Sequence, residues 1–311
     1  MYFALKRTGA ALITLFLVSV FSFLAFSVIR GDPASLMLGT NATEEQLATF
    51  REELGLNRSI PVRYLEWLGN FLSGNLGNSL RFRSEAISVL IIERLPISFF
   101  LALLSLFFIV VIAVPVSLFS VRRENSLIDR IVNIGTATGI SVPHFFLGVL
   151  FIWIFGISLR LFTAGVYVGY RSLCFPALAI AVPNAAILTK FLRSWLFKEQ
   201  RSDYVRTARS KGASPSFALR RHALRNALIP SITVLGMIVA EVFSGSIVIE
   251  QVFAIPGIGR LLIAAITSRD YPLIQTLVVY IAFVVVIANT LVDIAIQVID
   301  PRIRLEKEVR E

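Results

Sequence analysis

Four polar side chains that could bind a charged ligand lie inside long apolar stretches of the sequence. They are Glu241, Asn289, Asp293 and His144. A carboxylate is costly in lipid, so one inside an apolar stretch usually faces water or a partner side chain. If Glu241 and Asp293 face a water-filled path, they could bind an amino group or another cation. If they face neighbouring helices, a hydrogen bond or ion pair that holds the helices together is the simpler interpretation.

The sequence lacks the motifs of common catalytic sites. It contains no GxxxxGK[ST] phosphate loop, no HExxH and no GxSxG. The glycines of GTATG, Gly135 and Gly139, are not followed by lysine, and small residues at this spacing usually pack membrane helices together. With one cysteine, Cys174, and two histidines, the chain has little material for a metal site. We therefore expect no catalytic residue, no cofactor and no metal.

One stretch is far more basic than its surroundings. It reads RTARSKGASPSFALRRHALRNALIP and runs from Arg206 to Pro230. The chain has a formal net charge of +10, but in a membrane protein basic residues mark cytoplasmic loops more often than nucleic-acid sites, so we expect no nucleic acid. Three interpretations of the stretch remain open: a solvated loop, a site for anionic lipid headgroups, and a docking site for a cytoplasmic protein.

The composition places the chain in a membrane. Of its 311 residues, 56% are apolar and 16% are charged, and the mean hydropathy is +0.77. A bilayer core needs about 20 apolar residues in a helix. Six stretches qualify, namely 10–29, 95–121, 131–159, 173–196, 229–253 and 273–299. The sequence therefore predicts an all-α integral membrane protein with six transmembrane helices, the first of them an uncleaved anchor.

Lysine and arginine residues predict how these helices are oriented. Six spans put both termini on one side, and the segments on that side carry 19 of the 30 basic residues. Seven of the other 11 lie in the segment 30–94, which is too long to govern orientation. The short loops on the far side hold only Arg160, Arg171, Arg260 and Arg269. Both termini and the basic stretch are therefore predicted to be cytoplasmic.

Local signals predict a helical hairpin in the basic stretch. Ser202 or Asp203 can cap a first helix that ends before Gly212, a suitable C′ residue. Ser214 can cap a second helix that has Pro215 in its first turn. One face of this second helix should pack on the membrane bundle while the arginines project elsewhere; the apolar residues of that face are Phe217, Leu224 and Leu228.

The basic stretch resembles the EAA loop of binding-protein-dependent ABC importer permeases. Thr207 and Ala208 stand at the alanines of that pattern and Gly212 at its glycine. Arg206 replaces the leading glutamate and Arg225 a proline, which fits the branch for dipeptides, oligopeptides, glutathione and nickel. Other stretches similar to this branch occur in the same order: GDPASLMLG (31–39), FREELGL (50–56), YLEWLGNFLSGNLGNSL (64–80), ERLPISFFLAL (93–103), SVPHFFLGVL (141–150), VFAIPGIGRLLIAAITSRDYPLIQ (252–275) and DPRIR (300–304).

The resemblance implies a type I ABC importer permease fold (MetI-like) with a cytoplasmic coupling hairpin. The first helix of the hairpin would dock in an ATPase, so that closure of the ATPase dimer on ATP moves the membrane helices and exposes a binding site to each side in turn. The implied coupling residues are Asp203, Tyr204, Arg206, Thr207, Ala208, Lys211, Gly212, Ala213 and Ser214. The implied partners are a second homologous permease, forming a heterodimer, two cytoplasmic ABC ATPase subunits and an extracytoplasmic solute-binding protein.

The resemblance also gives expectations for the rest of the chain. It implies a permease subunit for di- or oligopeptides in a bacterial or archaeal cytoplasmic (inner) membrane, with one helix plus an external segment over 1–94 and a five-helix core over 95–311. Part of an outer gate, or else an ordinary turn, would be formed by Pro256, Gly257 and Gly259. The external segment should contain a helix with a capping box of Thr43 and Gln46 and a second helix near Pro61, lying on the membrane or contacting the solute-binding protein.

An ion-coupled secondary transporter is the alternative function. Such a protein would use intramembrane carboxylates, which Glu241 and Asp293 could supply. It should also show internal repeats, and the sequence contains no convincing one. A membrane-embedded hydrolase would need a nucleophile and a base on facing helices, for which no motif is present. The ordered similarities along the chain favour the ATP-driven importer.

Overall fold

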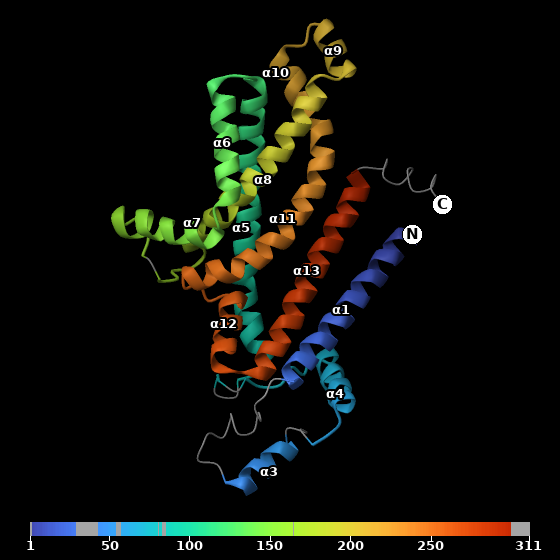
Figure 1. The fold of residues 1–311 in the computed structure, drawn as a ribbon, viewed down its shortest axis with the longest axis vertical. Coiled ribbons are helices and arrows are strands. Elements are labelled where there is room, and N and C mark those ends of the chain that lie inside the picture. Colours follow the sequence, from blue (N-terminus) through green and yellow to red (C-terminus); the bar gives the residue numbers. More distant parts are fainter. Residues whose placement is uncertain are drawn as a thin grey trace. The chain divides into compact units, whose positions relative to one another are not determined.

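The computed structural model describes residues 2–28, 43–53, 57–79, 81–82, 85–163 and 165–299 of an α-helical chain (Figure 1). Two short π-helical segments, Ile152–Ser158 and Leu219–Ala223, and one 3₁₀ segment, Tyr170–Leu173, join some of the α-helices. The described α-helices are α1 (Tyr2–Val28), α3 (Glu44–Glu53), α4 (Ile60–Leu72), α5 (Ile87–Arg122), α6 (Leu127–Ser141), α7 (His144–Phe151), α8 (Cys174–Gln200), α9 (Asp203–Ser210), α10 (Pro215–Ala218), α11 (Leu224–Val252), α12 (Ile258–Ser268) and α13 (Tyr271–Ile299).

The predicted membrane-spanning helices are present. Five helical segments are long and apolar enough to cross a bilayer by themselves: Arg7–Ala25, Ile87–Arg122, Tyr170–Gln200, Pro215–Val252 and Tyr271–Ile294. Two further segments, Leu127–Ser141 and His144–Ser158, qualify only together and are bent by 101° at the break between them. Counted as one broken span, this pair brings the total to the six that the sequence predicts.

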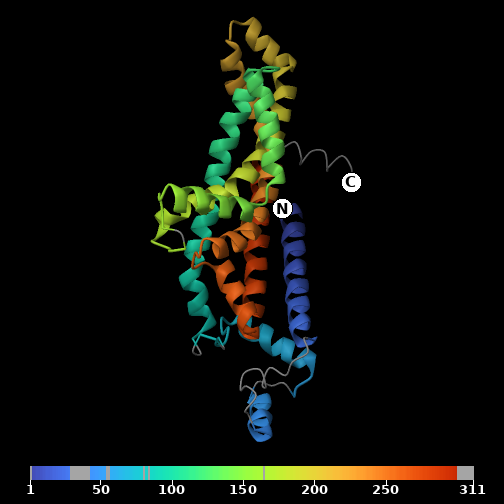
Figure 2. The ribbon, with the colours of Figure 1, turned by 60° about the vertical axis from the view of Figure 1, so that its left-hand side comes forward.

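The third span is not the single helix expected over 131–159. α6 ends at Ser141, and Val142 adopts extended angles of φ −90° and ψ 122°. Pro143 comes next, and proline disfavours the helical conformation in the residue before it. α7 then begins at His144 and turns sharply away from α6 in both ribbon views (Figures 1 and 2). The prediction was wrong here because it counted apolar residues and overlooked this proline.

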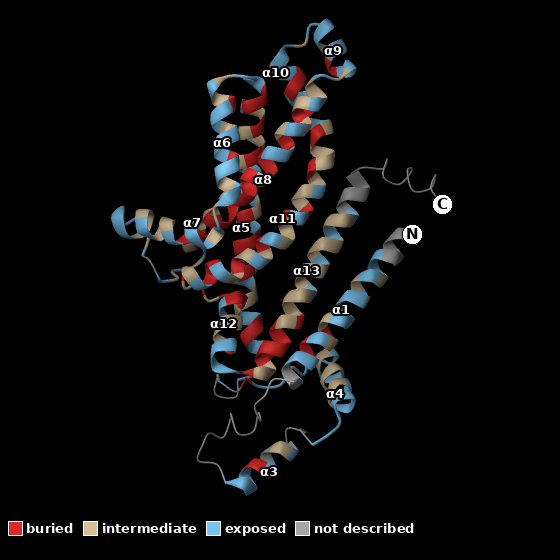
Figure 3. Cartoon of the chain, viewed as in Figure 1, coloured by how far each residue is buried: buried red, intermediate tan, exposed pale blue. Residues whose placement is uncertain are grey.

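The chain divides into two compact units, and α8 is the central helix of the larger one (96–260 and 287–311). About 67% of its apolar window is buried, against 28% or less for the other spans that stand alone. α6, α7 and α11 pack against it, and Figure 3 colours its buried residues red. Small side chains let helices approach closely. The alanines that are almost fully buried along α8 are Ala177, Ala179, Ala181 and Ala185.

The two glycines of GTATG behave differently in α6. A Cβ atom placed on Gly139 would lie 2.9 Å from Cβ of Ala186 in α8, so the absence of a side chain allows these helices to touch. Nothing lies within 4 Å of such an atom on Gly135. The prediction that both glycines serve helix packing therefore holds for Gly139 and is wrong for Gly135.

The smaller unit (1–95 and 261–286) holds the described part of the external segment. The predicted capping box is confirmed, because the Thr43 amide donates to Gln46 Oε1 (3.0 Å) and the Gln46 amide donates to Thr43 Oγ1 (3.3 Å). The predicted second helix is α4, which packs on α1 through a 2.9 Å hydrogen bond between Tyr64 and Ser19. The similar stretches 31–39 and 300–304 lie outside the described residues.

Candidate functional site

The first helix of the basic hairpin, defined here as residues 202–228, is short. α9 has Ser202 at its N-cap position, although the Ser202 hydroxyl donates to the carbonyl oxygen of Glu199 (2.6 Å) instead of capping α9. Gly212 follows the helix with a φ of +91°. This left-handed conformation costs a residue with a Cβ atom about 1–2 kcal/mol, so glycine terminates the helix as the sequence predicts.

α9 has one buried side and one exposed side. Val205 is 1% exposed and packs in an apolar cluster with residues of α5, α8 and the second hairpin helix. The opposite side is largely exposed, as the pale blue of α9 in Figure 3 shows. The predicted coupling residues that are exposed are Asp203, Tyr204, Arg206, Thr207, Lys211, Gly212 and Ser214, whereas Ala208 and Ala213 are half-buried.

Tyr204 ties α9 to the end of α8. Its hydroxyl donates a hydrogen bond of 2.5 Å to Oε2 of Glu199. Burial raises the pKa of Tyr204, and the hydrogen bond to the Glu199 carboxylate raises it further. The phenol therefore stays protonated at physiological pH and remains a donor to Glu199.

The second hairpin helix begins as predicted, and of its predicted packing face Leu224 and Leu228 do pack against the buried cluster, whereas Phe217 does not. Ser214 is the N-cap and accepts a hydrogen bond from the Phe217 amide (3.3 Å). Phe217 itself is 55% exposed, so the expectation that it packs on the bundle was wrong. The buried residues are Ala218, Leu219, Ala223 and Ala227. The π segment Leu219–Ala223 breaks the 3.6-residue repeat on which the prediction relied, because it adds a residue to the turn.

Two ion pairs join the C-terminal end of α8 to α6 and to the loop between α5 and α6. The Arg193 guanidinium of α8 binds both carboxylate oxygens of Asp129 in α6, at 2.8 and 3.0 Å from Nη2, and Ser120 of α5 donates to Asp129 at 2.5 Å. This group is mostly shielded, with the side chain of Asp129 9% exposed. Arg201 and Glu124 form a second pair at 2.7 Å that is far more exposed. Sequence reasoning missed both pairs because their partners lie more than 60 residues apart.

The structure brings two of the four predicted intramembrane polar residues together. Glu241 is exposed on α11, one turn before Gly245, where a Cβ atom would lie 3.9 Å from Nδ1 of the half-buried His144 at the start of α7. Asn184 of α8, 0% exposed, contacts Nε2 of His144 through its amide nitrogen at 3.1 Å. Asn289 and Asp293 are half-buried and one turn apart on α13.

Two of the three predicted gate residues, Gly257 and Gly259, lie beside a buried carboxylate. Glu250 of α11 is 0% exposed; it accepts hydrogen bonds from the Ser98 hydroxyl of α5 (2.6 Å) and the Arg260 amide of α12 (3.1 Å). The Ser98 hydroxyl in turn accepts from the Ile258 amide at 2.8 Å. The first amides of a helix have no carbonyl partner within the helix and need another acceptor. Glu250 and Ser98 therefore fix the start of α12.

The glycines leave room for this carboxylate. A Cβ atom on Gly257 would lie 2.4 Å from the Glu250 carboxyl group, and one on Gly259 would lie 2.4 Å from Cα of Ile247. Pro256 precedes them in the turn between α11 and α12. Sequence reasoning did not single out Glu250, although the rule that selected Glu241, a carboxylate inside an apolar stretch, applies to it equally.

Among the residues whose placement is described, no group of three or more His, Cys, Asp or Glu side chains could hold a metal ion. The titratable groups that do meet inside the bundle instead bind hydroxyl groups, amides and guanidinium groups of the same chain. The exposed basic face of the hairpin is thus the part of the site best suited to a partner.

Two family models match consecutive regions of the chain. The model of the binding-protein-dependent transport system inner membrane component matches residues 110–305. The model of the N-terminal region of the membrane component of binding-protein-dependent transport systems matches residues 1–102. The match over residues 110–305 includes both the broken third span and the hairpin.

Curated relatives align over almost the whole chain. A probable peptide ABC transporter permease of Sinorhizobium fredii is 37% identical over 310 residues, covering 97% of this chain and 99% of the relative. An oligopeptide transport system permease of Bacillus subtilis is 33% identical, with 97% and 98% covered. A dipeptide transport system permease of Lactococcus lactis is also 33% identical, with 97% and 99% covered. The chain therefore belongs to the family of binding-protein-dependent transport system inner membrane components.

Proposed function

We propose that the chain is the permease subunit of an ATP-driven importer of di- or oligopeptides. Relatives named as peptide, oligopeptide and dipeptide permeases align over nearly their full length and support this substrate class. One observation carries the coupling role: α9 presents exposed polar residues on one side and is packed onto the spanning helices by the other. ATP would be hydrolysed by two separate ABC ATPase subunits.

Force applied to α9 would reach several spans at once. The Val205 cluster and the Tyr204–Glu199 hydrogen bond join α9 to α8. The second hairpin helix continues into α11, and the Arg193–Asp129 pair joins α8 to α6. Because these connections are packed or charged rather than flexible, docking at the exposed side of α9 would move the helices as a group. The residues from Asp203 to Ser214 are the proposed docking surface.

The proposed translocation path runs past the broken third span. Interrupted helices at membrane depth usually line a water-filled cavity or a binding site. Glu241 is exposed next to this break, where its carboxylate could pair with the free amino group of a peptide. Asn289 and Asp293 are proposed for the same path. The turn with Pro256, Gly257 and Gly259 is proposed as part of the outer gate.

The remaining partners follow from the family and from charge. A second homologous permease would complete the pathway as a heterodimer, and the solute-binding protein would contact the external segment, to which α3 and α4 belong. The excess of basic residues supports cytoplasmic termini and a cytoplasmic hairpin. The protein would lie in the inner membrane of a bacterial or archaeal cell.

Purification of the tagged chain in mild detergent, followed by mass spectrometry of the bound proteins, tests the coupling role. We expect ATPases with a phosphate-binding loop, a second six-span permease and, after Gly212→Pro, loss of the ATPases alone. Proline requires a φ near −65°, whereas Gly212 has +91° and its amide donates to the Arg209 carbonyl at 3.0 Å. Uptake of a dipeptide and a tetrapeptide by the wild-type complex in liposomes tests the substrate class.

Gly74 provides a matched control. It follows α4 with a φ of +80°, and its amide donates to the Phe71 carbonyl at 3.2 Å, so Gly74→Pro breaks the same kind of helix end outside the hairpin. This variant should retain the ATPases. Normal ATPase binding and uptake by Gly212→Pro would refute the coupling role. Recovery of the chain without any ATPase, together with uptake driven by an ion gradient, would favour a secondary transporter.

A further inference from the structure

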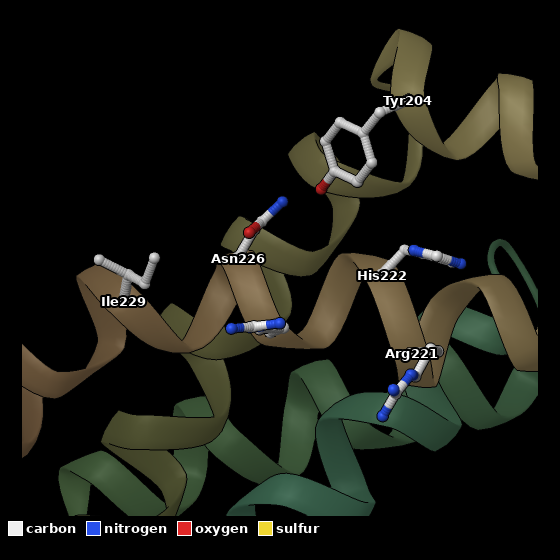
Figure 4. Close-up of a pocket in the computed structure, with 6 residues that line it drawn as sticks. Tyr204, Arg221, His222, Asn226 and Ile229 are labelled. Atoms are coloured by element: carbon white, nitrogen blue, oxygen red, sulfur yellow. The ribbon is translucent and has the colours of Figure 1, made fainter. Parts of the chain in front are cut away.

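A cavity of about 640 Å³ lies between the two helices of the basic hairpin (Figure 4). Tyr204 reaches it from α9, and the other lining residues come from the second helix. Its lining residues are Tyr204, Arg221, His222, Arg225, Asn226 and Ile229. The volume is within the range of small-ligand sites, about 300–1,000 Å³.

The lining offers hydrogen-bond donors and positive charge without a competing acid. Among the described residues, no ion pair or side-chain hydrogen bond involves Arg221 or Arg225. The nearby Glu199 carboxylate already accepts a hydrogen bond from Tyr204. Two guanidinium groups, one imidazole and one amide thus surround a space suited to an oxyanion, for which arginine is the favoured partner.

The lining of the cavity changes from basic to apolar along the second helix. Arg221, Arg225 and Ile229 follow one another in steps of four residues, from the basic hairpin to the first residue of the apolar stretch 229–253. Figure 4 shows Arg221 and Ile229 at opposite ends of the row of labelled residues on this helix. Arginines that immediately precede an apolar span lie at the depth of the lipid headgroups. A charged end beside an apolar end matches a phospholipid better than a soluble ion.

We propose that this cavity binds the phosphate group of an anionic phospholipid, with Arg221 and Arg225 at the phosphate and Ile229 beside the glycerol and acyl region. His222 and Asn226 supply further hydrogen bonds to the headgroup. The proposal requires only that the chain spans a membrane, so it stands independently of the transported substrate. It assigns the lipid and the docking protein, two interpretations left open by the sequence, to neighbouring parts of one hairpin that share Tyr204.

A bound lipid would join the two hairpin helices. Tyr204 belongs to α9, whereas both arginines belong to the second helix, so an occupant that contacts both sides favours their packed arrangement. A ligand that binds only the folded state raises stability by an amount that grows with the logarithm of its concentration relative to its Kd. The melting temperature of the purified chain should therefore rise when the lipid is added.

Native mass spectrometry and thermal unfolding of the full-length chain in detergent test the site, with phosphatidylglycerol and phosphatidylcholine as probes. We expect one tightly retained phosphatidylglycerol and a higher melting temperature with that lipid only. In Arg221→Gln/Arg225→Gln, affinity for phosphatidylglycerol should fall about 25-fold, a factor of about five for each arginine near a membrane surface. The matched control is Arg123→Gln/Arg220→Gln, which removes the same charge from exposed positions outside both the cavity and the proposed docking surface and should keep the affinity.

Three outcomes would overturn the proposal. Equal losses in the two double variants would mean that only net charge matters. Displacement of phosphatidylglycerol by millimolar inorganic phosphate, with the same rise in melting temperature, would assign the cavity to a soluble anion. Unchanged lipid affinity in Arg221→Gln/Arg225→Gln, combined with loss of the co-purifying ATPases, would assign it to an acidic side chain of a partner protein. Both arginines are exposed, so folding of the variant should not obscure these results.

Discussion

The turn between α11 and α12 (residues 253–257) and the basic hairpin both carry charge at an end of α11, but they use it in opposite ways. At the turn, Glu250 is fully buried and bound to Ser98 and Arg260 of its own chain. On the hairpin, the arginines of the second helix are exposed and lack ion-pair partners among the described residues. Buried polar groups that are fully hydrogen-bonded fix a conformation, whereas exposed charged groups are available to other molecules.

Removal of the buried carboxylate should have the largest effect. Glu250→Ala leaves the Ser98 hydroxyl and the Arg260 amide without their acceptor and opens a cavity. We expect a loss of about 3 kcal/mol or more, seen as a lower melting temperature and a lower yield of monodisperse protein. Glu241→Ala, in the same helix but exposed, is the control and should change stability little. Similar melting temperatures for the two variants would contradict the contrast between buried and exposed charge.

A methyl group beside the same carboxylate should have a somewhat smaller effect. Gly257→Ala places a carbon atom 2.4 Å from the Glu250 carboxyl group, and relief of this clash must displace the turn. A loss of about 1–3 kcal/mol is expected in thermal unfolding. Gly135→Ala, in α6 with nothing within 4 Å, should be neutral or slightly stabilising. A stable Gly257→Ala protein would show that the turn is not tightly packed.

The two ion pairs at the C-terminal end of α8 allow the effect of burial on the strength of an ion pair to be measured. Asp129→Asn removes a shielded charge that Arg193 binds twice, and it should cost about 2 kcal/mol. Glu124→Gln removes the exposed partner of Arg201 and should cost less than about 1 kcal/mol. Melting curves at low and high salt provide the measurement, because salt should affect only the exposed pair. Equal costs would mean that burial does not determine the strength of these pairs.

The smallest effect on stability is expected on the outer face of α9. Arg206 is exposed, and its Nη1 lies 3.9 Å from Oδ1 of Asp203. Arg206→Gln should therefore change the free energy of unfolding by less than about 0.5 kcal/mol, which melting curves would show as an almost unchanged melting temperature. The same variant should weaken retention of the ATPases during purification. A destabilised protein, or undiminished ATPase retention, would remove Arg206 from the proposed docking surface.

Local features were predicted well from the sequence. The capping box at Thr43, the helix end at Gly212 and the helix start at Ser214 depend on a few consecutive residues, and each was found in its predicted place. The six apolar stretches were also found, because length and hydropathy suffice to identify them. The break at Pro143 was visible in the sequence and was overlooked.

Features that depend on distant partners could not be predicted. Ser98 and Glu250 are separated by 152 residues, and His144 and Asn184 by 40, so only the fold reveals that they meet. The exposure of Phe217 was missed for a different reason, since a π segment leaves no periodic pattern in so short a stretch. The docking, path and gate residues remain predictions until the proposed variants are measured.

The π segment Leu219–Ala223 determines how the first part of the hairpin is rotated about the axis of α11, and one residue can change this rotation. An α-helix turns by about 100° per residue, and a π segment accommodates one residue more than an α-helical turn would hold. Deletion of one residue there should rewind the segment into an α-helix and rotate the preceding part of the chain by about 100° about the axis of α11. The orientation of α9 about the axis of α11 is thus set by a single extra residue.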